Sequence, residues 1–387
     1  MNSIVRVDNC CGCRACEHSC PAKCITFVKN AEGFLCPSLE ESQCLNCGSC
    51  LKVCPQFNNI DLNEPSEVYA AITRDADLLK KSTSGGAMSV FAKNIIELGG
   101  VVFGSVLNTK DWLVSFDSTE TLNGLAAFRG SKYVQSDTVD SYKTVFEMLK
   151  KDRWVMFVGT PCQVAGLKMF LTFKHVSQEK LFAVDILCHG VPSPTLFIEH
   201  VKYSEQKYRQ KLIDFSFRDK TVFPNKTALK YVFPNKTIVV LGRCDTYFEA
   251  FISGSSYRDC CYSCKFATHK RIGDVSLGDY WGIKKHHPDF DSSNGVSLIL
   301  VNTERGKQML EKSAFDKTKS SLAFALETNG ILKNPSSKSD CRDIFYSTVN
   351  EDGYYKATKK LLRTKSMLYN WLLTHLPKSV IKKLSKR

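Results

Sequence analysis

The chain has 387 residues, 43% of them hydrophobic, a length that suits two or three domains with substantial cores. It contains no apolar run of about eighteen residues and its first residues lack the apolar core of a secretory signal, so we expect neither a membrane-spanning nor a secreted protein but a cytoplasmic one. Of the formal charge of +14, ten Lys or Arg residues and no acidic residue fall between 356 and 387, which leaves +4 elsewhere. The basic charge therefore does not indicate a nucleic-acid-binding body.

Cysteines are concentrated near the N-terminus. Eleven of the 18 lie between Cys10 and Cys54. In a large chain expected to stay in a reducing compartment, such clustering indicates metal ligation and not a disulfide scaffold. We therefore predict a cysteine-rich domain over residues 1–57.

Eight of these cysteines form two copies of the spacing C-x2-C-x2-C-x3-C-P, in which the fourth cysteine of each copy ligates the other [4Fe–4S] cluster. One predicted cluster has the ligands Cys10, Cys13, Cys16 and Cys54, and the other has Cys20, Cys44, Cys47 and Cys50. A zinc site is the alternative, and two complete copies of an eight-thiolate pattern make it remote. Cys11, Cys24 and Cys36 are out of register, and we interpret them as packing residues.

Residues 58–67 are polar, contain Pro65 and are typical of a linker. The N-terminal part of the body, 68–150, has a strand pattern at 68–72, a helical pattern at 87–98 preceded by Ser or Thr as a cap, and a strand pattern at 101–107.

The second part of the body, 151–340, continues this alternation. Strand patterns occur at 154–158 and 181–187, and Thr160 followed by Pro161 predicts the cap and first position of a helix. The echo VFPNKT at 222–227 and 232–237 predicts the two arms of a β-hairpin. Strands alternating with helices favour an α/β body.

Four cysteines of the body could form a third [4Fe–4S] site. If the strands at 154–158 and 181–187 are parallel neighbours, Cys162 and Cys188 lie at the carboxyl edge of one sheet, and the helix that begins near Cys162 favours a thiolate there. Cys261 and Cys264 supply a C-x2-C pair, for which Cys260 is an alternative member. The residues alone leave open whether Cys162 and Cys188 are ligands or small buried side chains. Cys244 and Cys341 have no motif around them and are interpreted as structural.

Seven ordered motifs give the chain a resemblance to a known family: STSGGA at 82–87, GGVVFG at 99–104, FRGSKYVQS at 128–136, VGTPCQVAGL at 158–167, LCHGVPSP at 187–194, CYSCKFA at 261–267 and GDYWGI at 278–283. Together they resemble the coenzyme F-420 hydrogenase/dehydrogenase beta-subunit family over nearly the whole chain. The resemblance implies FAD next to a [4Fe–4S] cluster held by Cys162, Cys188, Cys261 and Cys264. It also implies the fold class, an α+β ferredoxin-like dicluster domain fused to an α/β flavoprotein-type body.

The FAD that this resemblance implies has no G-x-G-x-x-G fingerprint to bind it. Backbone N–H groups at a helix start and basic side chains suit its pyrophosphate. We therefore predict contacts from three segments: Ser84, Gly85 and Gly86; Arg129, Gly130, Ser131 and Lys132; Gly159, Thr160 and Gln163. The alternatives are an ordinary turn for the first segment and a solvated loop for the second. We assign no catalytic residue, and His189 is not interpreted as one.

The tail, 356–387, is basic and amphipathic and contains Trp371. It predicts either peripheral contact with an anionic membrane surface or a helix packed on the body with a basic rim.

These observations predict an iron–sulfur flavoprotein oxidoreductase. Electrons would pass between a hydride donor or acceptor, with reduced coenzyme F-420 the one the family name implies, and a soluble redox carrier or partner reductase through FAD and [4Fe–4S] clusters. One alternative is a non-catalytic electron-transfer subunit of a separate reductase or dehydrogenase. Another is a ferredoxin domain carried on a flavin-free binding module. No nucleic acid is expected as a partner.

Overall fold

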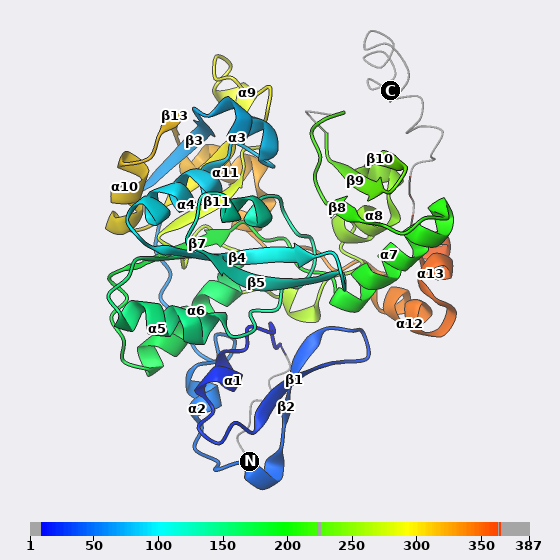
Figure 1. Cartoon of the computed structure of the whole chain (residues 1–387), viewed down its shortest axis with the longest axis horizontal. Coiled ribbons are helices and arrows are strands. Elements are labelled where there is room, and N and C mark those ends of the chain that lie inside the picture. Colours follow the sequence, from blue (N-terminus) through cyan, green and yellow to red (C-terminus); the bar gives the residue numbers. More distant parts are fainter. Residues whose placement is uncertain (1–8, 223–225, 363, 365–387) are drawn as a thin grey trace.

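The computed structural model describes residues 9–222, 226–362 and 364. Its parts are an N-terminal cysteine-rich domain, a central sheet covered by helices on both faces, and a smaller unit built on a three-stranded sheet (Figure 1). The predicted tail lies outside the described residues from 365 onward, so neither of its two interpretations is tested. Within the described part of the chain, no helix is long and apolar enough to cross a membrane.

The cysteine-rich domain repeats one backbone conformation. The residues on either side of the second cysteine of each motif have a positive φ: Gly12 (73°) and Arg14 (62°) in the first copy, Asn46 (52°) and Gly48 (70°) in the second. A short helix follows each, and an antiparallel hairpin lies between them: α1 (Ala15–Ser19), β1 (Ile25–Lys29), β2 (Leu35–Leu39), η2 (Glu41–Gln43) and α2 (Ser49–Lys52). The repeated spacing thus gives a repeated fold.

The central sheet has eight strands in the order β13-β3-β12-β11-β7-β6-β4-β5. The four strands β11, β7, β6 and β4 are parallel, and the edges on both sides are antiparallel. The strands are β3 (Glu67–Thr73), β4 (Val101–Asn108), β5 (Leu113–Thr119), β6 (Val155–Gly159), β7 (Leu181–Ile186), β11 (Val275–Asp279), β12 (Ser297–Val301) and β13 (Phe315–Ser320). The body is therefore mixed α/β, and the expected parallel pairing of β6 with β7 is confirmed.

Alternate residues of the parallel strands face two separate cores, as a sheet with a period of two requires. Phe157 packs toward α5 (Ser141–Lys150) and α6 (Pro161–Phe173), whereas Met156 packs toward α4 (Ala87–Glu97). The other helices and 3-10 turns of this part are α3 (Ala76–Lys81), η3 (Gly124–Phe128), α9 (Ile283–His286), α10 (Glu304–Glu311), α11 (Leu322–Thr328) and η6 (Gly330–Leu332).

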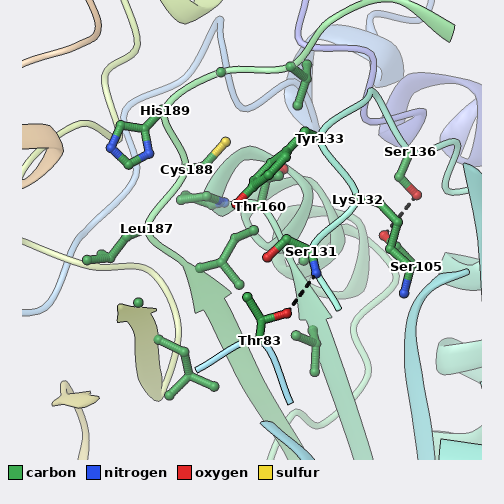
Figure 2. Close-up of a pocket in the computed structure, with 18 of the residues that line it drawn as sticks. Thr83, Ser105, Ser131, Lys132, Tyr133, Ser136, Thr160, Leu187, Cys188 and His189 are labelled. Carbon is green, nitrogen blue, oxygen red and sulfur yellow. Dashed lines mark hydrogen bonds between the residues drawn. The ribbon is translucent and has the colours of Figure 1, made fainter. Parts of the chain in front are cut away.

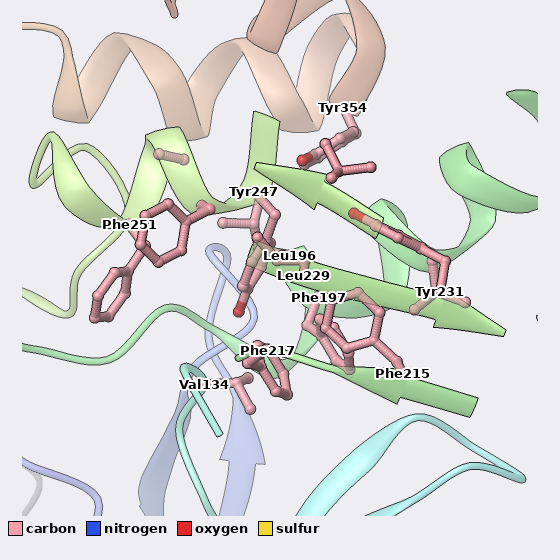
Figure 3. Packing of buried hydrophobic residues seen from close by; sticks show 14 of the residues in the cluster. Val134, Leu196, Phe197, Phe215, Phe217, Leu229, Tyr231, Tyr247, Phe251 and Tyr354 are labelled. Atoms are coloured by element: carbon pink, nitrogen blue, oxygen red, sulfur yellow. The ribbon is translucent and has the colours of Figure 1, made fainter. Parts of the chain in front are cut away.

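The smaller unit encloses an aromatic core (Figure 3). His200 at its centre is hydrogen-bonded through Nε2 to the Tyr231 hydroxyl (2.8 Å) and through Nδ1 to that of Tyr354 (3.0 Å). Its elements are α7 (Pro194–Tyr208), β8 (Asp214–Ser216), β9 (Ala228–Phe233), β10 (Lys236–Leu241), η4 (Gly242–Cys244), α8 (Thr246–Ile252), η5 (Asp259–Cys261), α12 (Arg342–Asp352) and α13 (Tyr354–Leu361).

Two local predictions were wrong. The hairpin is β9–β10, so the second VFPNKT copy contains its turn instead of forming an arm paired with the first copy. Helix α4 is capped by Gly86 with φ 85°, without a side-chain cap, because Ser84 Oγ donates to the Val296 carbonyl instead (2.7 Å). The capping prediction at the next site was right, since Thr160 is the N-cap of α6 and Pro161 its first residue.

The cysteine-rich domain packs against α5 and α6 of the body, below the sheet in Figure 1. Polar contacts also hold the cysteine-rich domain against the rest of the chain. Arg14 Nη2 donates to Asp137 Oδ2 (2.8 Å), Thr138 Oγ1 donates to the Cys13 carbonyl (3.1 Å), and Arg342 Nη2 donates to Glu32 Oε2 (2.7 Å).

Candidate functional site

The thiols of Cys10, Cys13, Cys16 and Cys54, here called the inner site, lie together beside the body. Burial and the thiols of Cys10, Cys54 and Cys50 raise the pKa of Cys16 well above its ordinary value. Cys13, Cys16 and Cys54 are buried. Gly166 allows the cysteine-rich domain to pack closely against α6, because a Cβ at that position would lie 2.8 Å from Cys13 Sγ.

The other predicted set, here called the outer site, lines a separate small cavity together with Cys24: Cys20, Cys44, Cys47 and Cys50. Cys24 Sγ is 3.4 Å from Cys20 Sγ, and Cys47 is exposed. Pairing the fourth cysteine of each motif with the opposite copy, as predicted from the spacing, therefore agrees with the arrangement of these thiols. The outer site faces solvent and the inner site faces the body.

The backbone around these thiols suits an anionic iron–sulfur cluster. Left-handed residues stand on either side of the second cysteine of each motif, and backbone N–H groups that face one concavity are a recurrent environment of Fe–S sites. Gly12 N donates to Cys10 Sγ (3.3 Å), and backbone N–H groups also lie against the sulfurs of Cys13, Cys16 and Cys54. Among the described residues, no three His, Cys, Asp or Glu side chains could hold a single metal ion.

A cavity of about 760 Å³ opens at the carboxyl edge of β6 and β7. Six cysteines line it: Cys11, Cys162, Cys188, Cys260, Cys261 and Cys264. Burial and the nearby thiols of Cys162 and Cys264 raise the pKa of Cys188. The structure thus brings together the four cysteines predicted for the third site, here called the body site, from three distant segments.

The thiol of Cys162 lies in the first turn of α6. A hydrogen bond with Cys11 and burial raise its pKa well above the ordinary value, so the lowering expected from the helix N-terminus is outweighed. A thiolate at this position therefore needs a cation or metal to stabilise it.

Cys11 and Cys260 are closer to the site than the sequence indicated. Cys11 is hydrogen-bonded to both Cys13 and Cys162, so its thiol lies between the inner site and the body site. Cys260 is buried next to Cys261, and the nearness of its thiol helps to raise the pKa values of Cys162 and Cys264. Both residues are therefore neighbours of the body site.

Most of the predicted flavin contacts line the same cavity: Ser84, Gly86, Arg129, Gly130, Ser131, Lys132, Gly159, Thr160 and Gln163. Gly85 does not, because it is pressed against β3 and β12, where a Cβ would lie 2.2 Å from the Ala71 carbonyl oxygen. Figure 2 shows Ser131, Tyr133, Thr160 and Cys188 around one space, with Thr83 Oγ1 accepting from Ser131 N (3.3 Å).

The cavity wall carries polar groups suited to an anionic ligand. Arg129 Nε is buried and has no hydrogen-bond partner among the described residues. Within the described part of the chain, the acceptors of Lys132 Nζ are the carbonyls of Ala127 and Arg129 (3.0 Å each), and burial lowers its pKa to about 7. An anionic group such as a pyrophosphate would accept a hydrogen bond from Arg129 Nε and would favour the charged form of Lys132.

Sequence reasoning did not assign the opposite wall. It is formed by Tyr133, Arg218, Asp279 and the half-exposed Trp281. Arg218 pairs with Asp279 and lies 5.5 Å from the centre of the Trp281 ring. Tyr133 and Trp281 belong to two of the quoted motifs, but Arg218 reaches them from the smaller unit, through its pair with Asp279.

A buried ion pair fixes two of the body-site segments. Asp185 lies near the end of β7, three residues before Cys188, and Arg271 lies seven residues after Cys264. Arg271 is 2% exposed, and the two side chains form an ion pair. Arg271 also donates to the carbonyls of Phe266 and Thr268 (3.1 Å each). The pair therefore links the β7 edge to the C-x2-C loop.

The fold and the cysteine sites define a mixed α/β chain with an N-terminal cysteine-rich domain at the edge of a cavity. Residues 152–320 match the family model that describes the C terminus of the beta subunit of coenzyme F420 hydrogenase/dehydrogenase. Over these residues the chain is similar to that beta-subunit family, which supports the resemblance carried by the sequence motifs.

Two curated proteins are similar to the chain. The F subunit of the F(420)H(2) dehydrogenase of Methanosarcina mazei is 25% identical over 194 residues, which are 48% of this chain and 54% of the relative. The coenzyme F420-dependent sulfite reductase of Methanocaldococcus jannaschii is 24% identical over 321 residues, 80% of this chain and 46% of the relative. The chain thus spans about half the length of these relatives. A chain of the F420-reducing [NiFe] hydrogenase complex from Methanosarcina barkeri aligns with TM-score 0.47 and 15% identity, covering 77% of this chain and 91% of that one.

Proposed function

We propose that the chain is an iron–sulfur flavoprotein oxidoreductase that transfers electrons between a hydride donor or acceptor in the cavity and a one-electron partner outside. The match of residues 152–320 to the family model and the names of the two curated relatives, a dehydrogenase subunit and a reductase, support an oxidoreductase in general. Both names refer to coenzyme F420, which makes the reduced deazaflavin the first donor to test.

One observation carries this proposal: the cysteines of the body site and the predicted flavin contacts line the same cavity. Arg129, Lys132 and the start of α4 would hold the phosphates of FAD, while Thr160 and Gln163 lie beside Cys162 at the start of α6. Gln163 Oε1 accepts from Thr160 N (3.0 Å), which fixes this turn. When bound, FAD would supply the exchange of two-electron and one-electron chemistry that no side chain can perform.

The three cysteine sites follow one another through the molecule. Cys11 connects the body site with the inner site, and Cys16 of the inner site is influenced by Cys50 of the outer site. Around the outer site, Cys47 and Leu45 are exposed. Electrons released in the cavity would therefore leave at the outer site, where a redox partner can approach.

A second candidate is an electron-transfer subunit of a larger assembly that performs no turnover alone. It is favoured because one curated relative is named as a subunit, and because the chain spans only about half the length of either relative. Exposed Phe57 and Leu45 on the cysteine-rich domain would suit contact with another protein.

Anaerobic purification followed by iron and flavin quantitation tests the main proposal. Three four-iron clusters predict about twelve irons per chain with one FAD, whereas about eight irons without flavin would rule the proposal out. Bleaching of the flavin absorbance by reduced coenzyme F420, added anaerobically, would identify the donor, and turnover without added subunits would exclude the second candidate.

Matched cysteine variants locate the body site. Cys162→Ala should lower the iron content by about four per chain and leave the two clusters of the cysteine-rich domain in place. Cys341→Ala is the control. Among the described residues, the hydrogen-bond partners found for the Cys341 thiol are the hydroxyls of Ser255 (3.4 Å) and Ser339 (3.3 Å). Equal iron contents of the two variants would contradict the assignment.

A further inference from the structure

A buried arginine of the body extends into the cysteine-rich domain. Arg258 is 4% exposed, and its backbone N–H is bonded to the Val191 carbonyl of the body (3.0 Å). Its guanidinium donates to three acceptors of the N-terminal domain: the Cys10 carbonyl (2.5 Å), the Leu35 carbonyl (2.8 Å) and Cys36 Sγ (3.0 Å).

Among the described residues, no carboxylate forms an ion pair with Arg258. The two other arginines that are equally buried are both paired, Arg271 with Asp185 and Arg342 with Glu32. A guanidinium keeps its proton in proteins, and a buried charge without a counter-charge is costly. The positive charge of Arg258 therefore needs a negative partner that the carboxylates do not supply.

The strongest charge interactions of Arg258 are with four thiols: Cys10, Cys260, Cys36 and Cys11. Cys10 belongs to the inner site, Cys260 adjoins Cys261 of the body site, and Cys11 connects the two. Arg258 thus lies between two sets of proposed ligands. A four-iron cluster held by four thiolates is anionic, and its negative charge grows by one unit on reduction.

We propose that Arg258 is the shared counter-ion of the inner site and the body site, holding both ligand sets together across the domain junction and favouring the reduced state of their clusters over that of the outer site. This inference rests on the proposed function, because it requires clusters at both sites. A fixed positive charge in a water-poor region stabilises the more negative, reduced form, and net charge is one of the factors that set cluster potentials. Arg258 acts as a positioning residue, since it ligates no iron.

Redox titration of the full-length protein, purified anaerobically and followed by electron paramagnetic resonance, tests this role. Arg258→Gln removes the charge but keeps a polar donor. In this variant, the ratio of reduced to oxidised cluster should fall at least tenfold at a fixed potential for the inner site and the body site. A tenfold fall is equivalent to about 59 mV for a one-electron couple. Arg258→Lys, which keeps the charge, should change this ratio less than threefold. The cluster of the outer site should titrate as in the wild type in both variants.

The control is Arg342→Gln, which removes another buried arginine that joins the domains but lies against Glu32 and the Tyr257 carbonyl. Unchanged potentials in Arg258→Gln, or an equal shift in Arg342→Gln, would overturn the inference. If Arg258→Gln loses iron, Arg258→Lys decides: retained iron and potentials support a counter-ion, and equal loss overturns it. About eight irons in the wild type would instead overturn the proposed function itself.

Discussion

The ion pair of Arg271 with Asp185 should determine both the stability of the body and the integrity of the body site. Arg271→Met keeps most of the side-chain volume but removes the charge and its hydrogen bonds. It leaves the charge of the fully buried Asp185 with one hydrogen bond among the described residues, donated by Gly273 N to Oδ2 (2.8 Å). The carbonyls of Phe266 and Thr268 also lose their donor.

The expected cost follows from this burial. Removing one partner of a buried ion pair typically destabilises a protein by about 3–5 kcal/mol, because the other charge stays buried without compensation. For cooperative unfolding of a chain of 387 residues, an unfolding entropy of about 2.1 cal/mol/K per residue gives about 0.8 kcal/mol/K. The thermal midpoint should therefore fall by about 4–6 °C.

Differential scanning calorimetry under anaerobic conditions measures this shift, and iron analysis reports on the body site. The double variant Asp185→Asn with Arg271→Met removes both charges and should be no less stable than Arg271→Met alone. Midpoints that fall by less than about 1 °C in Arg271→Met, or costs of the two single variants that simply add in the double variant, would refute the reasoning.

Three other predictions concern the junction, the cavity and the smaller unit. Gly166→Ala places a Cβ 2.8 Å from Cys13 Sγ and should reduce the free energy of unfolding by about 1–3 kcal/mol in chemical denaturation, whereas Gly330→Ala enters open space and should not. Burial lowers the pKa of Lys132 from 10.5 to about 7, so FAD affinity, measured by flavin fluorescence, should fall as the pH rises through and above 7, and Lys132→Met should abolish this dependence. Because the unfolded chain keeps that proton up to about pH 10.5, the contribution of Lys132 to stability without FAD should rise over the same range. His200→Phe removes one hydrogen bond from each of two buried tyrosine hydroxyls, while Tyr231 still donates to Asp245 and Tyr354 still bonds to Thr246. It should therefore cost about 0.5–1.5 kcal/mol for each bond lost, and an unchanged thermal midpoint would contradict this.

The local parts of the site could be predicted because their information is local. Two copies of one cysteine spacing predict which fourth cysteine joins which set, and Cys20 lines one small cavity with the first three cysteines of the second copy. That these sets hold clusters stays a prediction. The helix start at Thr160 and Pro161 was readable from capping chemistry, and the buried strands on either side of α6 placed Cys162 and Cys188 at one sheet edge. That these thiols are ligands remains a proposal.

The second wall of the cavity could not be predicted, since it depends on how distant segments meet. Arg218 and Asp279 are an ion pair across 61 residues, and nothing in either neighbourhood indicates the other. Arg258 contacts backbone carbonyls 223 and 248 residues earlier, and a carbonyl has no sequence signature. Gly85 was misjudged for a similar reason, because a glycine required for close packing against β3 and β12 looks the same in the sequence as one that exposes its N–H to a ligand.

Helix α6 explains why the inner site and the body site lie side by side. Cys162 in its first turn lines the cavity, and Gly166, four residues later, receives Cys13. Residues at i and i+4 share one face of a helix, so Cys162 and Gly166 are offset by about 6 Å along the helix axis. Cys11 fills the interval with hydrogen bonds to both thiols. The geometry of one helix and the close approach that Gly166 permits therefore help to set the separation of the two sites, together with the polar contacts of the junction.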